Sequence, residues 1–181
     1  MNDKVYFKKV YKMNAIFKRK SIRQFLDKEI EDKKIERLLK SGMQAPSAIN
    51  SQPWEFLVVK DKEGIKKIEN MSLYSKPART STCCIITLFN QDYLSQFENY
   101  RWVQQDMGAC TENILLQAVE EGLGGVWLGT YPDEERVNYL KENFNIPENV
   151  FPYSVIVLGY PTEDYTGTDR FDKDRIHYES Y

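Results

Sequence analysis

Hydrophobic positions along the chain follow two patterns, one typical of helices and one typical of strands. Residues 31–43 carry apolar side chains at Ile35, Leu38, Leu39 and Met43, a spacing that predicts an amphipathic helix. Residues 83–89 (CCIITLF) are apolar on both faces, which indicates a central strand covered on both sides. The same patterns predict helices at 62–72, 102–121 and 133–144, and strands at 56–59, within 122–129 and at 153–161.

The longest predicted helix, 102–121, is apolar on more than one side. Its apolar residues fall into two sets: Val103, Met107, Cys110, Ile114 and Ala118, and then Trp102, Ala109, Leu116 and Val119. A helix of this kind must be buried, either in the domain core or in a subunit interface. Glycines end it, and we expect Gly122 to be its C-cap.

The order of these elements predicts an α+β or three-layer α/β domain. At 181 residues, and without repeats or low-complexity linkers, the chain is expected to form a single domain over 1–181. Residues 1–14 would be an N-terminal extension. Residues 162–181 have no apolar period of their own, so we expect this tail to wrap on another subunit.

Composition excludes several classes of function. The 25 basic and 27 acidic residues give a net charge of −2, which disfavours nucleic-acid binding. No apolar run approaches the roughly 18 residues of a membrane span, and residues 1–14 lack the features of a secretory signal, so we expect a cytoplasmic protein. The three cysteines lack metal-ligand spacing and are expected to be reduced. With His177 as the only histidine, we expect neither a His-based zinc site nor a Ser-His-Asp triad.

Three segments could carry chemistry. Arg19-Lys20-Ser21-x-Arg23 offers three cations and a hydroxyl, which suit a phosphate group; an exposed basic patch is the alternative. Residues 45–54 (APSAINSQPW) form a proline-stiffened polar loop before a strand, and an ordinary connection is the alternative. The glycine-rich residues 122–129 (GLGGVWLG) let backbone approach a flat ligand, although their context is not that of a dinucleotide fingerprint.

In combination, these segments resemble the nitroreductase family of flavoproteins. The resemblance covers about residues 15–178 and rests on the order of RxSxR, PSxxNxQPW, the helix motifs DxGA and ENxLLxA, GLGxxWLG, and a late VIxLGYP. It implies an α+β three-layer fold, with a mainly antiparallel sheet between helices, in an intertwined homodimer. FMN would lie at the subunit interface, and NADH or NADPH would be the electron donor. No nucleic acid, membrane or metal is implied as a partner.

The resemblance also implies roles for individual residues. The FMN phosphate would be held by Arg19, Lys20 and Ser21, with Arg170 and Arg175 as the late phosphate-binding bases. Arg23 would reach the pyrimidine edge of the flavin, where a cation favours the reduced form. The other subunit would line the ring with Pro46, Ser47, Ala48 and Asn50. Leu128 and Gly129 would pass close to the flavin, with a backbone N–H near N5.

Residues 90–102 would cover the flavin. Tyr93, Phe97 and Tyr100 could stack there on nicotinamide or on a planar acceptor, and packing of a capping helix is the alternative.

No side chain of this set is an obvious general acid, so the flavin would carry the redox chemistry. The function implied is hydride transfer from NAD(P)H through flavin N5 to a nitroaromatic, a quinone or a similar small planar acceptor, by a ping-pong mechanism. Two alternatives remain open: a relative with another reaction, such as reductive dehalogenation, and a flavin-binding redox sensor or storage protein with little turnover.

Overall fold

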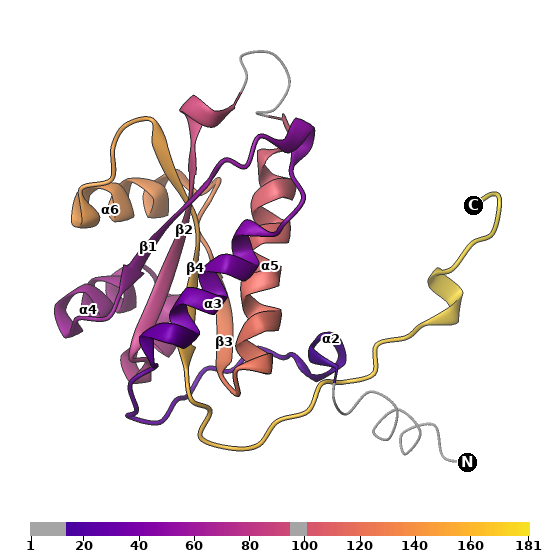
Figure 1. Ribbon diagram of the computed structural model, residues 1–181, viewed down its shortest axis with the longest axis horizontal. Helices are drawn as coiled ribbons and strands as arrows, with labels where there is room; N and C mark the ends of the chain where they lie inside the picture. Colours follow the sequence, from indigo (N-terminus) through magenta and orange to yellow (C-terminus); the bar gives the residue numbers. More distant parts are fainter. Residues whose placement is uncertain (1–13, 95–100) are drawn as a thin grey trace.

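The computed structural model describes residues 14–94 and 101–181 as helices on both faces of one antiparallel sheet (Figure 1). The sheet has the order β1-β2-β4-β3, made by β1 (Trp54–Val59), β2 (Cys83–Asn90), β4 (Val150–Gly159) and β3 (Gly124–Gly129). One face is covered by α3 (Asp32–Met43) and α5 (Val103–Glu120). The other is covered by α4 (Lys62–Asn70), the 3-10 helix η2 (Leu73–Thr80) and α6 (Glu134–Phe144). The expected three-layer α+β fold is confirmed.

The core is divided by the sheet into two clusters, and β2 contributes to both. Cys83 and Ile85 face α3 and α5, whereas Cys84 and Ile86 face the opposite layer, and all four are fully buried. A strand that is buried on both sides has no polar face, which explains why apolar residues lie on both faces of β2. All three cysteines are free and buried, and burial raises the pKa of each thiol to about 12, so they stay protonated.

The side of helix α5 that faces the sheet is buried in the core. Met107, Cys110 and Ile114 are fully buried there, whereas Trp102, just before the helix, is 47% exposed. The chain leaves the helix through Gly122, which has a positive φ of 71°. The N–H of Leu123 then donates to the Ala118 carbonyl at 2.7 Å, as in a Schellman motif. The C-cap is Glu121 rather than Gly122, and the glycine follows it in the position that needs the positive φ.

The ends of some elements differ from the prediction. Strand β4 begins at Val150 rather than at 153, although Pro152 lies within it. Proline is tolerated because β3 pairs only with Ser154–Gly159, so β4 has a single neighbour, β2, at this position. Helix α6 begins one residue late, since Asp133 is its N-cap and accepts a hydrogen bond from the Arg136 N–H. Within 14–94 and 101–181, no helix is both long and apolar enough to cross a membrane.

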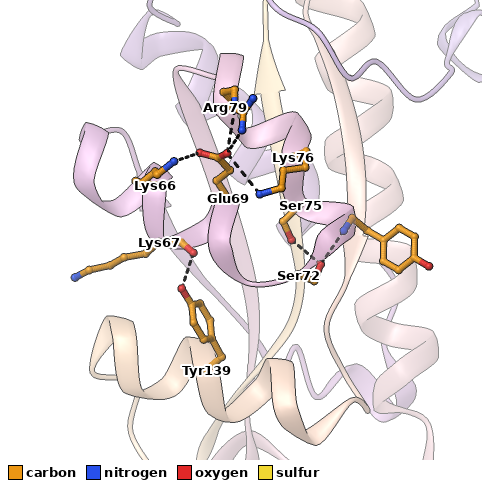
Figure 2. Close-up of polar contacts among 9 residues, drawn as sticks. Lys66, Lys67, Glu69, Ser72, Ser75, Lys76, Arg79 and Tyr139 are labelled. Carbon is orange, nitrogen blue, oxygen red and sulfur yellow. Dashed lines mark hydrogen bonds and ion pairs between the residues drawn. The ribbon is translucent and has the colours of Figure 1, made fainter.

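A buried carboxylate ties the layer of α4 and η2 together (Figure 2). Glu69 is 3% exposed, and its carboxylate lies 2.7 Å from the Lys66 ammonium and 2.9 Å from the Arg79 guanidinium. Lys76 adds a third cation at 3.7 Å. The hydrogen bonds from Lys66 and Arg79 lower the pKa of Glu69 to about 2. The hydroxyl of Tyr139 on α6 donates to the Lys67 carbonyl at 2.9 Å, which joins the third helix of this layer.

Candidate functional site

The basic segment lies along the outer edge of β3. It follows a single helical turn, α2 (Ala15–Lys18), whose N-terminus is capped by the Asn14 side chain. Ser21 forms an isolated parallel bridge with Gly125, and the Ile22 N–H donates to the Gly125 carbonyl at 3.0 Å. Two segments selected from the sequence, residues 19–23 and 122–129, are therefore neighbours in space.

The start of the C-terminal tail packs on the same region. The Tyr165 hydroxyl donates to the Leu123 carbonyl at 2.6 Å, and the Lys18 ammonium lies 5.5 Å from the centre of the Tyr165 ring. Gly167 passes so close to the Phe17 carbonyl that a side chain at 167 would collide with it. Beyond this point the tail extends away from the domain (Figure 1). Among the described residues, these contacts anchor the first part of the tail.

A cavity of about 290 Å³ lies between α2 and the tail, and two of the expected phosphate-binding residues border it. Its lining is Ile16, Phe17, Arg19, Thr168, Asp169, Arg170 and Phe171. Arg19 and Arg170, from opposite ends of the chain, thus meet at one cavity. Arg19 also forms an ion pair with Glu112 of α5, with 3.2 Å between Nε and Oε1.

Arg175 is not part of this cavity. It lies in the short 3-10 helix η5 (Lys173–Arg175) and pairs with Asp172 at 3.0 Å. Of the two late arginines, only Arg170 is therefore placed beside Arg19.

The remaining basic residues of this segment are exposed. Lys20 and Arg23 both lie at the surface. Arg23 has a weak contact with the Ser21 carbonyl at 3.5 Å. No ion pair joins Arg23 to Asp27, and both residues lie in the described part of the chain. The guanidinium of Arg23 is therefore available to a ligand.

The polar loop 46–53 has an unusual backbone around the 3-10 turn η1 (Ala48–Asn50). Ile49, Asn50 and Gln52 have φ values of 47°, 59° and 48°, in the left-handed region that side chains other than glycine disfavour. Each such residue costs about 1–3 kcal/mol, and strain of this kind is common at binding sites. The Gln52 N–H donates to the Ser47 hydroxyl at 2.9 Å. Pro46 and Asn50 are exposed, whereas Ser47 and Ala48 are half-buried.

Asp106 on α5 supports this loop, a role that the sequence analysis missed. Its Oδ1 accepts a hydrogen bond from the Ala48 N–H at 2.9 Å. The residue is 5% exposed, and its Oδ2 is buried without a hydrogen-bond partner among the described residues. Burial raises the pKa of this carboxyl, and the Ala48 hydrogen bond opposes the shift. The available signal was an acidic residue on the face of the helix that also carries Val103, Met107 and Cys110.

The end of β3 presents open backbone. Gly129 is exposed, and a Cβ added to it would meet no atom within 4 Å. The Leu128 side chain is buried in the core cluster between the sheet and the layer of α4, η2 and α6, so its backbone is the part that can face a ligand. Arg136 of α6, which the sequence analysis also missed, donates to the Gly129 carbonyl at 2.8 Å. This contact fixes the Gly129 carbonyl, and the N–H of the same peptide, which belongs to Thr130, donates to the Tyr153 carbonyl at 3.3 Å. The open part of Gly129 is therefore the side on which a Cβ would lie.

Of the three aromatic residues expected to cover the flavin, one can be placed. Tyr93 ends the 3-10 turn η3 (Gln91–Tyr93) and is 52% exposed. Phe97 and Tyr100 lie outside the described residues.

Within one chain, the loop 46–53 and the basic segment lie apart along α5. The loop contacts the first turn of this helix through Asp106, whereas Arg19 contacts Glu112. Six residues of helix separate these contacts by about 9 Å along the axis. Figure 1 shows the loop beside the N-terminal end of α5 and α2 beside its C-terminal half.

The fold and these surfaces define an α+β domain with a basic segment along the β3 edge and a polar loop of left-handed backbone. The model of the nitroreductase family matches residues 16–79 and 73–160, so the chain belongs to the nitroreductase family. A protein of Archaeoglobus fulgidus, provisionally named NADH dehydrogenase/NAD(P)H nitroreductase, is 44% identical over 172 residues, covering 93% of this chain and 98% of that protein. A protein of the same name from Methanothermobacter thermautotrophicus is 41% identical over 176 residues, covering 96% of this chain and 91% of that protein. The crystal structure of a Clostridium acetobutylicum protein, provisionally named NADH oxidase, is 46% identical in sequence and has a TM-score of 0.88. The match covers 93% of this chain and 100% of that chain.

Proposed function

We propose that this protein is an FMN-dependent NAD(P)H oxidoreductase that acts as a homodimer. The observation that carries the proposal is the convergence of Arg19 and Arg170 on one cavity between α2 and the C-terminal tail. Two relatives support the choice of cofactor: a Desulfovibrio desulfuricans nitroreductase that is 27% identical is solved in complex with FMN, and a 26% identical Bacillus subtilis protein is named FMN reductase [NAD(P)H].

The residues at the cavity fit the phosphate of FMN. A phosphate monoester carries about −1.5 to −2 charges and accepts several hydrogen bonds, which two guanidinium groups and a hydroxyl can donate. Arg19 and Arg170 supply the guanidinium groups, and Ser21 lies two residues beyond Arg19. The exposed guanidinium of Arg23 would face the pyrimidine edge, and the open Gly129 backbone would face the ring.

Bound FMN would accept a hydride from NAD(P)H and pass the electrons to an acceptor. The protein residues bind, orient and provide charge. Arg23 would favour negative charge on the pyrimidine side of the flavin. The loop carrying Ser47 and Asn50 would come from the second copy, because within one chain it lies away from the basic segment. The tail 162–181 would wrap on that copy, since Phe171, Ile176 and Tyr178 are 70%, 41% and 77% exposed.

The acceptor would be a nitroaromatic, a quinone or a similar planar molecule, reduced in a ping-pong cycle. Dehalogenation is a second candidate, because an iodotyrosine deiodinase of Haliscomenobacter hydrossis is 28% identical over 188 residues. This identity is well below the values for the NAD(P)H nitroreductase relatives. We therefore place reduction of a nitro or quinone group first.

The experiment is anaerobic mixing of the purified protein with NADH or NADPH in a stopped-flow instrument. We expect a yellow dimer with one FMN per subunit, rapid bleaching of the flavin band, and return of the band when a nitroaromatic or quinone is added. Parallel double-reciprocal plots would support the ping-pong cycle. Absence of bleaching with both donors would favour a sensor or storage protein. A monomer that holds one FMN would contradict the shared site.

A further inference from the structure

Between its two ends, the proposed flavin loop is hydrogen-bonded to the domain body, among the described residues, through one side chain. Within residues 14–94 and 101–181, the hydrogen bond from the Ala48 N–H to Asp106 is the only one that links residues 47–52 to another element. The other hydrogen bonds of the loop are internal, such as those of Gln52 with Ser47 and Asn50. The position of this strained loop on the protein therefore depends strongly on Asp106.

A carboxylate at position 106 is energetically unfavourable for the folded protein. Burying a carboxylate is unfavourable unless both oxygens are paired, yet Oδ2 is buried with no partner among the described residues. An apolar residue would pack in this part of α5 without that penalty, as Met107 and Cys110 do next to it. An apolar residue would, however, leave the Ala48 N–H without a hydrogen-bond acceptor. Ala48 is half-buried, and the next two residues, Ile49 and Asn50, have left-handed backbone conformations.

We propose that Asp106 is a positioning residue for the flavin site: by accepting the Ala48 N–H, it holds residues 47–52 in the conformation that presents Ser47 and Asn50 to the flavin bound by the second copy. This inference rests on the proposed function. Its structural part, the anchoring of Ala48 by Asp106, does not require a bound flavin.

The test compares variants of Asp106 in the full-length protein. Asp106→Ala removes the acceptor, whereas Asp106→Asn retains an amide oxygen for the Ala48 N–H. Asp106→Leu, of larger apolar volume, serves as the second variant without an acceptor if the alanine variant does not fold. Thr111→Val is the matched control, because Thr111 is fully buried on the same helix and its hydroxyl contacts Thr87 and Ser154, away from the loop.

Two measurements are made on each variant: the dissociation constant for FMN by fluorescence titration, and hydrogen exchange of the Ala48 amide by NMR. We expect Asp106→Ala to weaken FMN binding at least about tenfold and to accelerate exchange at Ala48. Asp106→Asn should stay within about threefold of wild type in affinity, in keeping with the modest energy of one hydrogen bond. Thr111→Val should lower the melting temperature without changing either quantity.

Several results would overturn the inference. These are wild-type affinity in Asp106→Ala, equal losses in the alanine and asparagine variants, or an equal loss in Thr111→Val. If the wild-type protein binds no FMN, the proposed function fails instead. Exchange at Ala48 then still decides whether Asp106 anchors the loop, and unchanged exchange in Asp106→Ala would refute it.

Discussion

The ion pair between Arg19 and Glu112 allows two predictions about FMN affinity, one of weaker and one of stronger binding. In the described structure Nε of Arg19 lies 3.2 Å from Oε1 of Glu112, and the two side chains are 20% and 44% exposed. A phosphate at the neighbouring cavity must share Arg19 with this carboxylate. Arg19→Ala should therefore weaken FMN binding, whereas Glu112→Gln should strengthen it.

The sizes of the two effects differ. A hydrogen bond between charged groups contributes about 1.5–3 kcal/mol, so Arg19→Ala should raise the FMN dissociation constant about 10- to 150-fold. A partly exposed ion pair contributes about 0.2–1 kcal/mol. Removing the competition from Glu112 should thus lower the constant by about 1.5- to 5-fold. Added salt should reduce both differences, because it screens exposed charges.

The assay is titration of the flavin-free protein with FMN and, separately, with riboflavin, followed by flavin fluorescence. Riboflavin lacks the phosphate, so neither substitution should change its affinity by more than about twofold, the size of a weak exposed contact. Arg175→Ala is the matched control, because Arg175 also pairs with a local carboxylate but lies outside the cavity. Weaker FMN binding in Glu112→Gln, or equal losses for FMN and riboflavin in Arg19→Ala, would refute the assignment of this cavity to the phosphate.

Two further predictions concern the flavin potential and acid stability. Arg23→Gln should lower the flavin midpoint potential by tens of millivolts in a redox titration, since about 30 mV corresponds to 1.4 kcal/mol for two electrons. An unchanged potential at full FMN occupancy would show that Arg23 does not face the ring. The pKa of Glu69 is lowered to about 2 by hydrogen bonds from Lys66 and Arg79, so its contribution to stability is present above its ordinary pKa of 4.5 and is lost as the pH falls toward 2. Glu69→Gln should be less stable than wild type in urea at pH 7 and should lose less stability between pH 4.5 and 2; parallel pH profiles would contradict this role.

Local patterns in the sequence predicted the four strands and the longer helices, but they did not predict the 3-10 helix η2 and left the choice between α+β and α/β open. The apolar residues on both faces of β2 indicated a strand covered on both sides, and the structure places helices on both. The start of β4 was not predictable in the same way, because Pro152 argues against a strand. That residue is acceptable only because β3 does not extend beside it, a fact of pairing between distant segments.

For the candidate site, the sequence by itself determined which residue types are present and in what order: the cations of 19–23, the stiff loop 46–53 and the glycines before β3. Tertiary structure decided which of them meet. Arg170 lies at the same cavity as Arg19, whereas Arg175 lies outside it and pairs with Asp172. Ala48 is hydrogen-bonded to Asp106 of helix α5, which is distant in sequence. The physical reason is that periodicity and turn chemistry act over a few neighbouring residues. Contacts such as these depend on how complete helices and strands pack, which no local pattern encodes.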